Sequence, residues 1–379
     1  MKRNAFDADM ELFRDNARKF FQKEIAPNWE RWREAGMVDR EAFLKAGEAG
    51  LLCIWADEAY GGLGLKDFRY EQILIEENAR YGDSGFFMSM HSRMFGPYIG
   101  NFGTEEQKQR FLPGCITGES ILAIAMTEPD AGSDLAGMKS RAEDRGDHWL
   151  LNGQKTFISN GILADVVIVA AKTDPENSHG VTLFLVERGM QGFERGRNLK
   201  KMGLKSQDTA ELFFKDVKIP KANVLGQVNG GFYHLMQGLA EERLIAATGN
   251  IAGAAYALDL TKNYVQERKV FGKPLSKFQN TRFKLAELDM EVDMGWAYLD
   301  KAVEAHNAGE LSPVDAARVK LFSSELFGRA VDEGVQLHGG NGYMEEYPIC
   351  RLYQDERIGR IAAGTSEIMK EIISRDILG

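Results

Sequence analysis

Hydrophobic and polar positions divide the chain into three stretches of different periodicity. Over residues 8–120 the apolar positions recur every three or four residues, which predicts amphipathic helices. Asp67 is the expected N-cap of one of them, at 67–80. Thr104 and Gln107 have the spacing of a capping box, which predicts another helix start.

A different pattern begins near residue 120. Short segments rich in β-branched and aromatic residues are separated by Gly, Asn, Asp or Pro, which is typical of strands joined by turns. They cover residues 147–158, 164–172, 180–187 and 208–219. Strands this short and this closely spaced predict a β-barrel or a β-sandwich.

Helical periodicity returns near residue 225, in long segments with few helix breakers. They cover residues 230–268, 276–308, 312–340 and 365–378. In the first of them Leu244, Ala247 and Ile251 mark one face, but Ile245 and Ala246 leave little polar surface opposite. A helix that is apolar on most sides is expected to be buried in a bundle.

The composition is that of a globular protein and disfavours several classes. Of 379 residues, 44% are hydrophobic and 27% are charged, which is enough apolar material for a large core. The 56 acidic residues outnumber the 47 basic ones, so neither a general nucleic-acid binder nor a protein of anionic membrane surfaces is favoured. No run of about 18 apolar residues occurs, so no transmembrane segment is expected.

Cysteine and histidine usage predicts neither a disulfide framework nor a metal site. Cys53, Cys115 and Cys350 lie far apart, and the chain has no CxxC or HExxH spacing. A reducing compartment is the simplest setting. The first residues are acidic and lack the apolar stretch of a secretory signal, so we expect either a bacterial-type cytoplasmic chain or the mature form of a protein of an organellar matrix.

Common nucleotide-binding and hydrolase motifs are absent. The chain has no GxxxxGK[ST], no GxGxxG between a strand and a helix, and no GxSxG, so a P-loop enzyme, a Rossmann dehydrogenase and an α/β-hydrolase lose support. The segments left as candidates for chemistry are 124–134, 157–161, 231–244, 268–279, and the pair 336–348 and 362–371.

The first two segments flank the predicted strands. In IAMTEPDAGSD, Thr127, Ser133 and the backbone around Gly132 can hydrogen-bond a polar ligand, although a simple turn explains the segment equally well. In FISNG, Phe157 and Ser159 are two residues apart on a predicted strand and point to the same face. They can cover a flat ring, or they belong to the core.

The third segment, GFYHLMQGLAEERL, places Glu241, Glu242 and Arg243 near the start of an almost entirely apolar helix. Acidic residues in a first turn are ordinary partners of the helix dipole. A carboxylate buried there would instead have a raised pKa and could act as a base. The helical wheel does not choose between Glu241 and Glu242.

The remaining segments interrupt helices with basic or small residues. In RKVFGKPLSKFQ, Arg268 can bind a phosphate, unless it is simply a solvated charge. Gly339, Gly340 and Gly364 would let phosphates approach the backbone, and a helix starting after Thr365 would offer free N–H groups. Taken singly, each of these segments is also explained by a plain turn.

Together these segments resemble the acyl-CoA dehydrogenase family over residues 8–378. The resemblance rests on TEPDAGSD (127–134), NGQKTFISNG (152–161), KMGLKSQDTAELFF (201–214), ERKVFGKPLSKFQ (267–279), QLHGGNGY (336–343) and GTSEIMKE (364–371). The third and the last motif are most similar to the long-chain branch. The resemblance implies an α+β multidomain fold with an N-terminal α-helical domain (1–120), a middle β-barrel (121–227) and a C-terminal four-helix bundle (228–379).

The resemblance also implies FAD as the cofactor and a set of residues that hold it. Those near the flavin are Ile124, Ala125, Met126, Thr127, Gly132, Ser133, Phe157, Ile158 and Ser159, and many relatives carry Trp in place of Phe157. Those that reach the adenine dinucleotide across a subunit boundary are Arg268, Phe271, Gln279, Gln336, Gly339 and Gly340. Those at the start of the last helix are Thr365, Ser366 and Glu367.

The acyl-CoA substrate is implied to contact Ser133, Ser178, His179, Tyr233, Glu241, Arg243, Ala363 and Gly364. Short- and medium-chain members of the family carry the catalytic Glu directly before the Gly-Thr of the last motif, where this chain has Ala363. The long-chain and isovaleryl branches place it before Arg-Leu, which matches Glu242. Glu241 matches no base position of the family. The backbone N–H of Ala363 and a ribityl hydroxyl of FAD are implied to hold the substrate carbonyl.

The implied activity is α,β-dehydrogenation of fatty acyl-CoA thioesters, long-chain ones above all, to trans-2-enoyl-CoA in β-oxidation. A homotetramer that passes electrons to an electron-transferring flavoprotein is implied with it. An isovaleryl-like, branched-chain specificity is the nearest alternative. Acyl-CoA oxidases and two-component flavin monooxygenases share the fold, and a non-enzymatic acyl-CoA-binding protein is the alternative of a different class.

Overall fold

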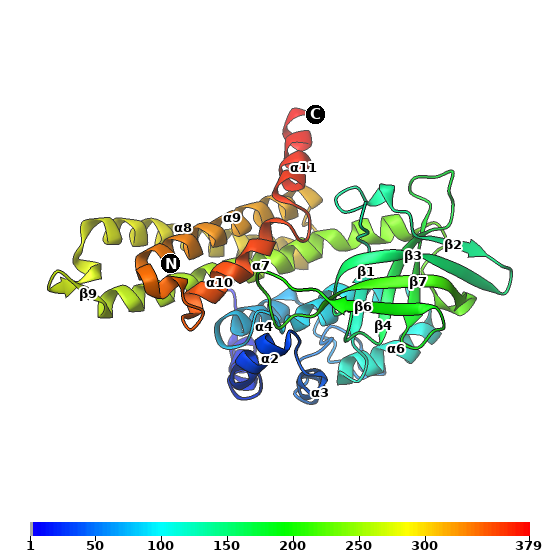
Figure 1. The fold of residues 1–379 in the computed structure, drawn as a ribbon, viewed down its shortest axis with the longest axis horizontal. Helices are drawn as coiled ribbons and strands as arrows, with labels where there is room; N and C mark the ends of the chain where they lie inside the picture. The colour runs from blue at the N-terminus through cyan, green and yellow to red at the C-terminus, as the bar shows by residue number, and fades with distance from the viewer. Residues whose placement is uncertain (1–2) are drawn as a thin grey trace.

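The N-terminal part of the chain is helical, as the sequence predicts. The computed structural model describes residues 3–379 and runs from helices to strands and back to helices (Figure 1). The helices of the first part are α1 (Ala8–Phe20), α2 (Trp29–Ala35), α3 (Arg40–Glu48), α4 (Phe68–Tyr81), α5 (Gly96–Phe102) and α6 (Glu105–Thr117). The predicted caps are confirmed: Asp67 accepts a hydrogen bond from the N–H of Arg69, and Thr104 forms a capping box with Gln107.

The middle part is a single sheet of short strands. They are β1 (Leu122–Ala125), β2 (Arg141–Asp144), β3 (His148–Ser159), β4 (Val166–Lys172), β5 (Val181–Glu187), β6 (Phe193–Asn198), β7 (Thr209–Pro220) and β8 (Val224–Leu225). They pair in the order β6-β7-β3-β2-β4-β5-β8, with β1 beside β4. The four predicted strands correspond to β3, β4, β5 and β7, whereas the pattern missed the shorter β1, β2, β6 and β8.

The sheet is not closed by hydrogen bonds. Within residues 3–379 no strand pairing joins β6 to β8, the two ends of the path, and β2 meets β4 through one pair, Arg141 and Lys172. The strands of the middle region therefore form an open path of pairings, and the closed barrel stays a prediction. Strands β4 and β5 are buried on both faces because helices cover one side and the rest of the sheet curls over the other.

The C-terminal part is built on three long helices that run side by side (Figure 1). They are α7 (Gly231–Glu267), α8 (Gln279–Asn307) and α9 (Pro313–His338), with the hairpin β9 (Lys269–Val270) and β10 (Lys273–Pro274) between the first two. Helix α10 (Pro348–Glu356) packs on α7 and α9, whereas α11 (Ser366–Leu378) contacts α9 and stands away from the body.

Helix α7 lies in the core of this bundle, which explains why its sequence is apolar on most sides. Leu244, Ile251 and Leu258 pack against Leu288 of α8 and Leu326 of α9. A Cβ atom on Gly253 would lie 2.4 Å from the ring of Phe327, so α7 and α9 approach too closely there for a larger residue.

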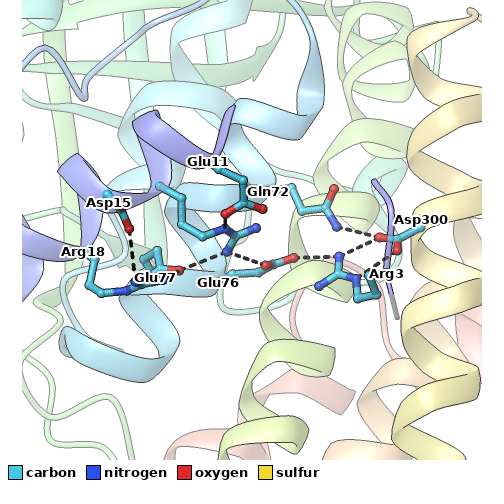
Figure 2. Close-up of polar contacts among 9 residues, drawn as sticks. Arg3, Glu11, Asp15, Arg18, Gln72, Glu76, Glu77 and Asp300 are labelled. Carbon is cyan, nitrogen blue, oxygen red and sulfur yellow. Dashed lines mark hydrogen bonds and ion pairs between the residues drawn. The ribbon is translucent and has the colours of Figure 1, made fainter. Parts of the chain in front are cut away.

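An ion-pair network joins the N-terminal segment to the bundle (Figure 2). Arg3 binds Asp300 of α8 and Glu76 of α4, at 2.7 and 2.9 Å. Arg14 of α1 binds the same Glu76 at 2.8 Å and Glu77 at 3.0 Å. Charges organised in such a network are worth more than isolated surface pairs. Within residues 3–379 no helix has both the length and the apolar character needed to cross a bilayer.

Candidate active site

Glu242 is a buried carboxylate on α7 with one hydrogen-bond donor, the hydroxyl of Tyr98 on α5, which lies 2.8 Å from its Oε1. Burial raises the pKa of Glu242 to about 7, with a smaller push from Glu241, while Tyr98 and Arg243 oppose the shift. A carboxyl group with a pKa near neutrality is suited to accept a proton at physiological pH.

Its neighbour Glu241 has a different environment. It forms ion pairs with Arg93 and, at 3.4 Å, with His306. Burial alone would raise the pKa of Glu241, but His306 and Arg93 lower it below its usual value. Because Glu241 is held by the guanidinium of Arg93 and by His306, and Glu242 by one neutral hydroxyl, the structure separates the two acids that the helical wheel left equivalent.

Both acids line one cavity of about 270 Å³ between α5 and α7. Its other lining residues are Arg93, Met94, Pro97, Tyr98, Asn101, Phe102, Gln237 and Gly238. Gly238 makes the contact between Tyr98 and Glu242 possible, since a Cβ atom there would lie 2.5 Å from the Tyr98 hydroxyl. Sequence reasoning missed both Tyr98 and Gly238.

The loop that follows β1 is fixed from beneath by a buried lysine. The ammonium of Lys155 on β3 donates to the carbonyl of Met126 at 3.0 Å and to Oε1 of Glu128 at 2.7 Å. Glu128 also accepts the backbone N–H groups of Lys139 and Ser140, at 2.6 and 3.0 Å. Lys155 and Glu128 therefore position the loop, and sequence reasoning missed them.

The predicted flavin residues of this loop differ in exposure. Ala125 is buried in the strand, and Ile124, Met126 and Thr127 are partly buried. Gly132 and Ser133 are exposed at the tip, and open space surrounds the position of a Cβ on Gly132.

Phe157 is 68% exposed, so its ring is not part of the core. It lies at an irregularity between β3 and β7, and its φ of +58° is one that bulky residues rarely adopt. The alternation of side chains is interrupted there, so the expectation that Phe157 and Ser159 share a face does not follow from strand geometry. Ile158 points into the sheet core, which leaves only its backbone for a ligand.

The residues predicted for the adenine dinucleotide gather at one end of the bundle. Arg268 follows the last turn of α7, Phe271 is 96% exposed in the hairpin, and Gln279 begins α8. At the same end, the Tyr264 hydroxyl donates to the carbonyl of His338 at 3.1 Å, which anchors the turn after α9. Gln336, in the last turn of α9, is exposed, and so are Gly339 and Gly340 in the turn that follows.

This cluster lies far from Glu242. Arg268 follows Glu242 by 26 positions on α7, which is about 39 Å along a helix. The predicted flavin residues and the predicted dinucleotide residues thus form two separate groups in the structure.

The turn before α11 has an unusual backbone. Ala363 and Gly364 have φ angles of +54° and +91°. Thr365 caps α11 by accepting the N–H of Ile368 at 3.2 Å, and buried Ser366 donates to Glu325 at 3.0 Å. Glu367 is exposed in the first turn. Strained non-glycine conformations such as that of Ala363 gather at functional sites.

The substrate residues predicted elsewhere lie around the start of α7. Ser178 and His179 are exposed between β4 and β5, and the His179 ring lies 6.5 Å from that of Tyr233. Arg243 is buried, yet its Nε has no hydrogen-bond partner and its Nη1 reaches only the carbonyl of Pro313, at 3.5 Å. Its hydrogen-bonding capacity is largely unused, which fits a ligand contact.

The described residues suit a large, flat, phosphate-bearing cofactor. The exposed ring of Phe157 offers a face to an aromatic system. The backbone is open at Gly132, Gly339 and Gly340, where no atom lies within 4 Å of a Cβ position, and Arg268 is an exposed cation. Among residues 3–379, no three His, Cys, Asp or Glu side chains are grouped to hold a metal ion.

Family models identify the class of protein. Residues 7–119, 123–217 and 229–378 match the N-terminal, middle and C-terminal domains of acyl-CoA dehydrogenase. The chain therefore belongs to the acyl-CoA dehydrogenase family, as its motifs predict, and is an oxidoreductase with FAD as its cofactor.

Individual relatives cover almost all of the chain. It is 47% identical over 379 residues to the mitochondrial long-chain specific acyl-CoA dehydrogenase of Sus scrofa, covering 99% of this chain and 88% of that protein. It is 37% identical over 377 residues to the isovaleryl-CoA dehydrogenase of Pongo abelii, covering 98% and 89%.

Solved structures agree in fold. An acyl-CoA dehydrogenase from Geobacillus kaustophilus has a TM-score of 0.98 at 46% identity, with both chains covered completely. One from Bacillus anthracis complexed with FAD has a TM-score of 0.92 at 32% identity, covering all of this chain and 68% of the other.

Proposed function

We propose that this protein dehydrogenates long-chain fatty acyl-CoA thioesters between Cα and Cβ, to trans-2-enoyl-CoA in fatty acid β-oxidation, with Glu242 as the catalytic base. The observation that carries the proposal is the environment of Glu242. It is a buried carboxylate whose pKa is raised to about 7, and it lines a cavity. The position directly before the Gly-Thr of the last motif holds Ala363, so no acid there competes for the role.

The reaction needs a base and a site for negative charge. A Cα proton next to a thioester is weakly acidic, so the base must be close to it and shielded from water. The Glu242 carboxylate removes this proton. The backbone N–H of Ala363 stabilises the charge that develops on the thioester oxygen, and loss of such a donor costs on the order of 3 kcal/mol. A backbone donor does not depend on its side chain, so Ala serves at this position.

FAD, when bound, accepts the hydride that leaves Cβ. We propose that Phe157 and Ser159 lie against its ring system, that the loop of Thr127 and Ser133 hydrogen-bonds the flavin, and that Thr365 and Glu367 contact it from the start of α11. Arg268, Gln279, Gln336 and Gly340 would hold the adenine dinucleotide. Arg243 and Tyr233 would contact acyl-CoA.

We also propose a homotetramer, in which one subunit completes the cofactor site of its neighbour. Its support is the separation of the proposed dinucleotide residues from the proposed base, since Arg268 lies about 39 Å from Glu242 along α7. A stripe of exposed apolar residues on α8, formed by Phe283, Met290 and Met294, offers a surface for a second copy. An electron-transferring flavoprotein would then reoxidise the cofactor.

The domain bounds, the closure of the barrel and the cellular setting are also proposals. The domains would span residues 1–120, 121–227 and 228–379, and the middle strands would wrap into a barrel although their pairing is open. The setting would be a reducing compartment, either a bacterial-type cytoplasm or an organellar matrix. The buried free thiols of Cys53, Cys115 and Cys350 support this setting.

The relatives supply both the proposed substrate and its main alternative. The long-chain enzyme of Sus scrofa is 47% identical, against 37% for the isovaleryl-CoA dehydrogenase of Pongo abelii. Both branches share the placement of the base, so Glu242 does not distinguish them, and identity favours the long-chain substrate.

The test is an anaerobic titration of the purified yellow protein with acyl-CoA thioesters of increasing length and with isovaleryl-CoA. Palmitoyl-CoA should bleach the flavin absorbance of the wild type most effectively. Glu242→Gln should keep its yellow colour and fail to bleach, whereas the matched control Glu241→Gln should still bleach. Bleaching by Glu242→Gln at the wild-type rate would remove Glu242 as the base. A colourless wild type would instead indicate an acyl-CoA-binding protein, and rapid oxygen consumption an oxidase.

A further inference from the structure

Lys320 is a lysine buried inside the bundle on α9, with no exposed surface. Its ammonium group donates a 2.6 Å hydrogen bond to the carbonyl oxygen of Gly364. Burying an ammonium group costs several kcal/mol in desolvation, so a buried lysine requires a hydrogen-bond partner that offsets this penalty. The partner here is a backbone carbonyl of the turn that precedes α11, and not a carboxylate.

Backbone hydrogen bonds hold the first part of that turn: the N–H groups of Ile361 and Ala362 both donate to the carbonyl of Ile358, at 2.9 Å. Residues 361–364 lie between a short 3-10 helix, Arg357–Arg360, and α11, outside any helix or strand. Both Ala363 and Gly364 have left-handed φ angles, a conformation that costs free energy for alanine. Such a turn keeps its shape only when surrounding contacts impose it. The hydrogen bond from Lys320 is one such contact, directly at Gly364.

Lys320 is also near the residue that follows the proposed base. Arg243, next to Glu242 on α7, is close enough to affect its titration, as are Glu325 on α9 and Glu367 on α11. Burial and the positive charge of Arg243 lower the pKa of Lys320 to about 8, and the two acids oppose this. The group is therefore charged at neutral pH and loses its proton in a mildly alkaline range.

We propose that Lys320 is a positioning residue of the active site, which holds the Ala363–Gly364 turn so that the backbone N–H of Ala363 is presented to the substrate carbonyl. The proposal rests on the function proposed above for that N–H. The hydrogen bond of Lys320 goes to the backbone of the turn, so Lys320 positions the turn and takes no part in proton or hydride transfer. Its positive charge also adds to the potential felt by the developing enolate.

The experiment compares three variants with the wild type. Lys320→Met removes the charge and the donor at similar volume, Lys320→Arg keeps both, and Lys19→Met is a control at an exposed lysine of α1. A misplacement of about 1 Å at a catalytic group costs on the order of 10²-fold in rate. We therefore expect kcat of Lys320→Met to fall by about that factor with a smaller change in KM, and kcat of the control to stay at the wild-type value.

Two further measurements distinguish positioning from general support of the fold. In the wild type, kcat should decline above about pH 8 as Lys320 loses its proton, and in Lys320→Arg this decline should be absent because a guanidinium stays charged. Amide hydrogen exchange over residues 361–368 should become faster in Lys320→Met while the core of α9 stays protected. This second readout does not depend on activity.

The inference would be overturned by a kcat of Lys320→Met within twofold of the wild type, or by the same alkaline decline in Lys320→Arg as in the wild type. If Lys320→Met does not fold, the comparison of the wild type with Lys320→Arg decides. Either result leaves the proposed function intact, since the wild type would still reduce its flavin with acyl-CoA. If none of the acyl-CoA thioesters reduces the flavin of the wild type, the proposed function is overturned, and this inference with it.

Discussion

The hydroxyl of Tyr98 donates a 2.8 Å hydrogen bond to Oε1 of Glu242 and so joins the N-terminal helices to the bundle at the proposed base. The two residues are 144 positions apart in the chain. Gly238, one turn before Glu242, leaves the space that the phenol ring occupies. The contact holds the carboxylate in one orientation at the cavity wall and partly offsets the effect of burial on its pKa.

Replacing Tyr98 with Phe should shift the pH dependence of turnover. Without the phenolic donor the carboxylate loses a hydrogen bond that favours its charged form, so the pKa of Glu242 should rise further above about 7. The base works when ionised, so the acidic limb of the kcat profile should move to higher pH. A hydrogen bond to a charged group contributes about 1.5 kcal/mol or more, which corresponds to about a tenfold loss at pH 7. Turnover should recover at alkaline pH, and an unchanged profile would contradict the assigned contact.

Glu71 on α4 should make the protein less stable as the pH rises. Its carboxyl group is completely buried, and burial raises its pKa from 4.5 to about 7, although Ser89 and Arg93 oppose this. The folded state thus binds the proton more tightly than the unfolded state, so stability falls between about pH 4.5 and pH 7. At about 1.4 kcal/mol for each pH unit, the full penalty is about 3 kcal/mol.

Glu71→Gln removes this charge and should raise the free energy of unfolding by up to about 3 kcal/mol at pH 8, with little effect at pH 4.5. Chemical denaturation at the two pH values measures the difference. Glu76→Gln is the matched control on the same helix, because Glu76 binds Arg3 and Arg14 (Figure 2). That variant should lose stability at pH 8. A gain for both variants would contradict the argument.

The sequence predicts much of the fold because its signals are local. Periodicity and caps identify long helices such as α4 and α7, and β-branched runs identify β4 and β5, since each pattern lies within one segment. The two-residue strand β8 and the four-residue β1 carry too few residues for a period to show. The order of the strands in the sheet depends on pairings between distant segments, which no local pattern encodes.

The residues of the proposed site likewise fall into those that local motifs predict and those that only the folded structure reveals. Motifs reveal Arg268 or Thr365 because their neighbours in the sequence are distinctive. Tyr98 and Lys320 have no motif around them, and their roles come from contacts with Glu242 and Gly364 that only the folded chain brings together. The family resemblance selects Glu242 over Glu241, but the physical difference between the two acids comes from the position of Arg93, which lies 148 positions from Glu241.

Lys155→Met should destabilise the protein and weaken flavin retention together. The variant leaves the carboxylate of Glu128 buried without its ammonium partner and frees the carbonyl of Met126. Removing one partner of a buried ion pair costs about 3–5 kcal/mol. The double variant Lys155→Met with Glu128→Gln should recover part of the loss, because it removes the unpaired buried charge. The recovery is incomplete because Lys139 and Ser140 donate to different oxygens of Glu128, and the single amide oxygen accepts only one of them. Denaturation midpoints and the flavin-to-protein ratio test this, and additive losses would contradict it.

Arg268→Ala should weaken retention of FAD by roughly tenfold or more, since a charge-assisted hydrogen bond to phosphate contributes about 1.5–3 kcal/mol. Lys269→Ala is the control, because it removes the same charge one residue further along the exposed connector. Flavin content after purification, and the affinity of the apoprotein for added FAD, measure the effect. Equal retention in the two variants would remove the phosphate role from Arg268.

Introducing charge on α8 should dissociate the proposed tetramer. Met290 and Met294 lie one turn apart, each with more than half of its surface exposed, and Phe283 continues the same stripe. An assembly that covers this stripe would have to bury two carboxylates in the double variant Met290→Glu/Met294→Glu, which is costly without cationic partners. We expect light scattering to give a smaller mass for this variant and the flavin content to fall with it, because Arg268 would no longer reach the neighbouring subunit. Leu12→Glu, a change of the same kind on exposed α1, should leave the mass unchanged. A double variant with the wild-type mass would place the subunit contact elsewhere.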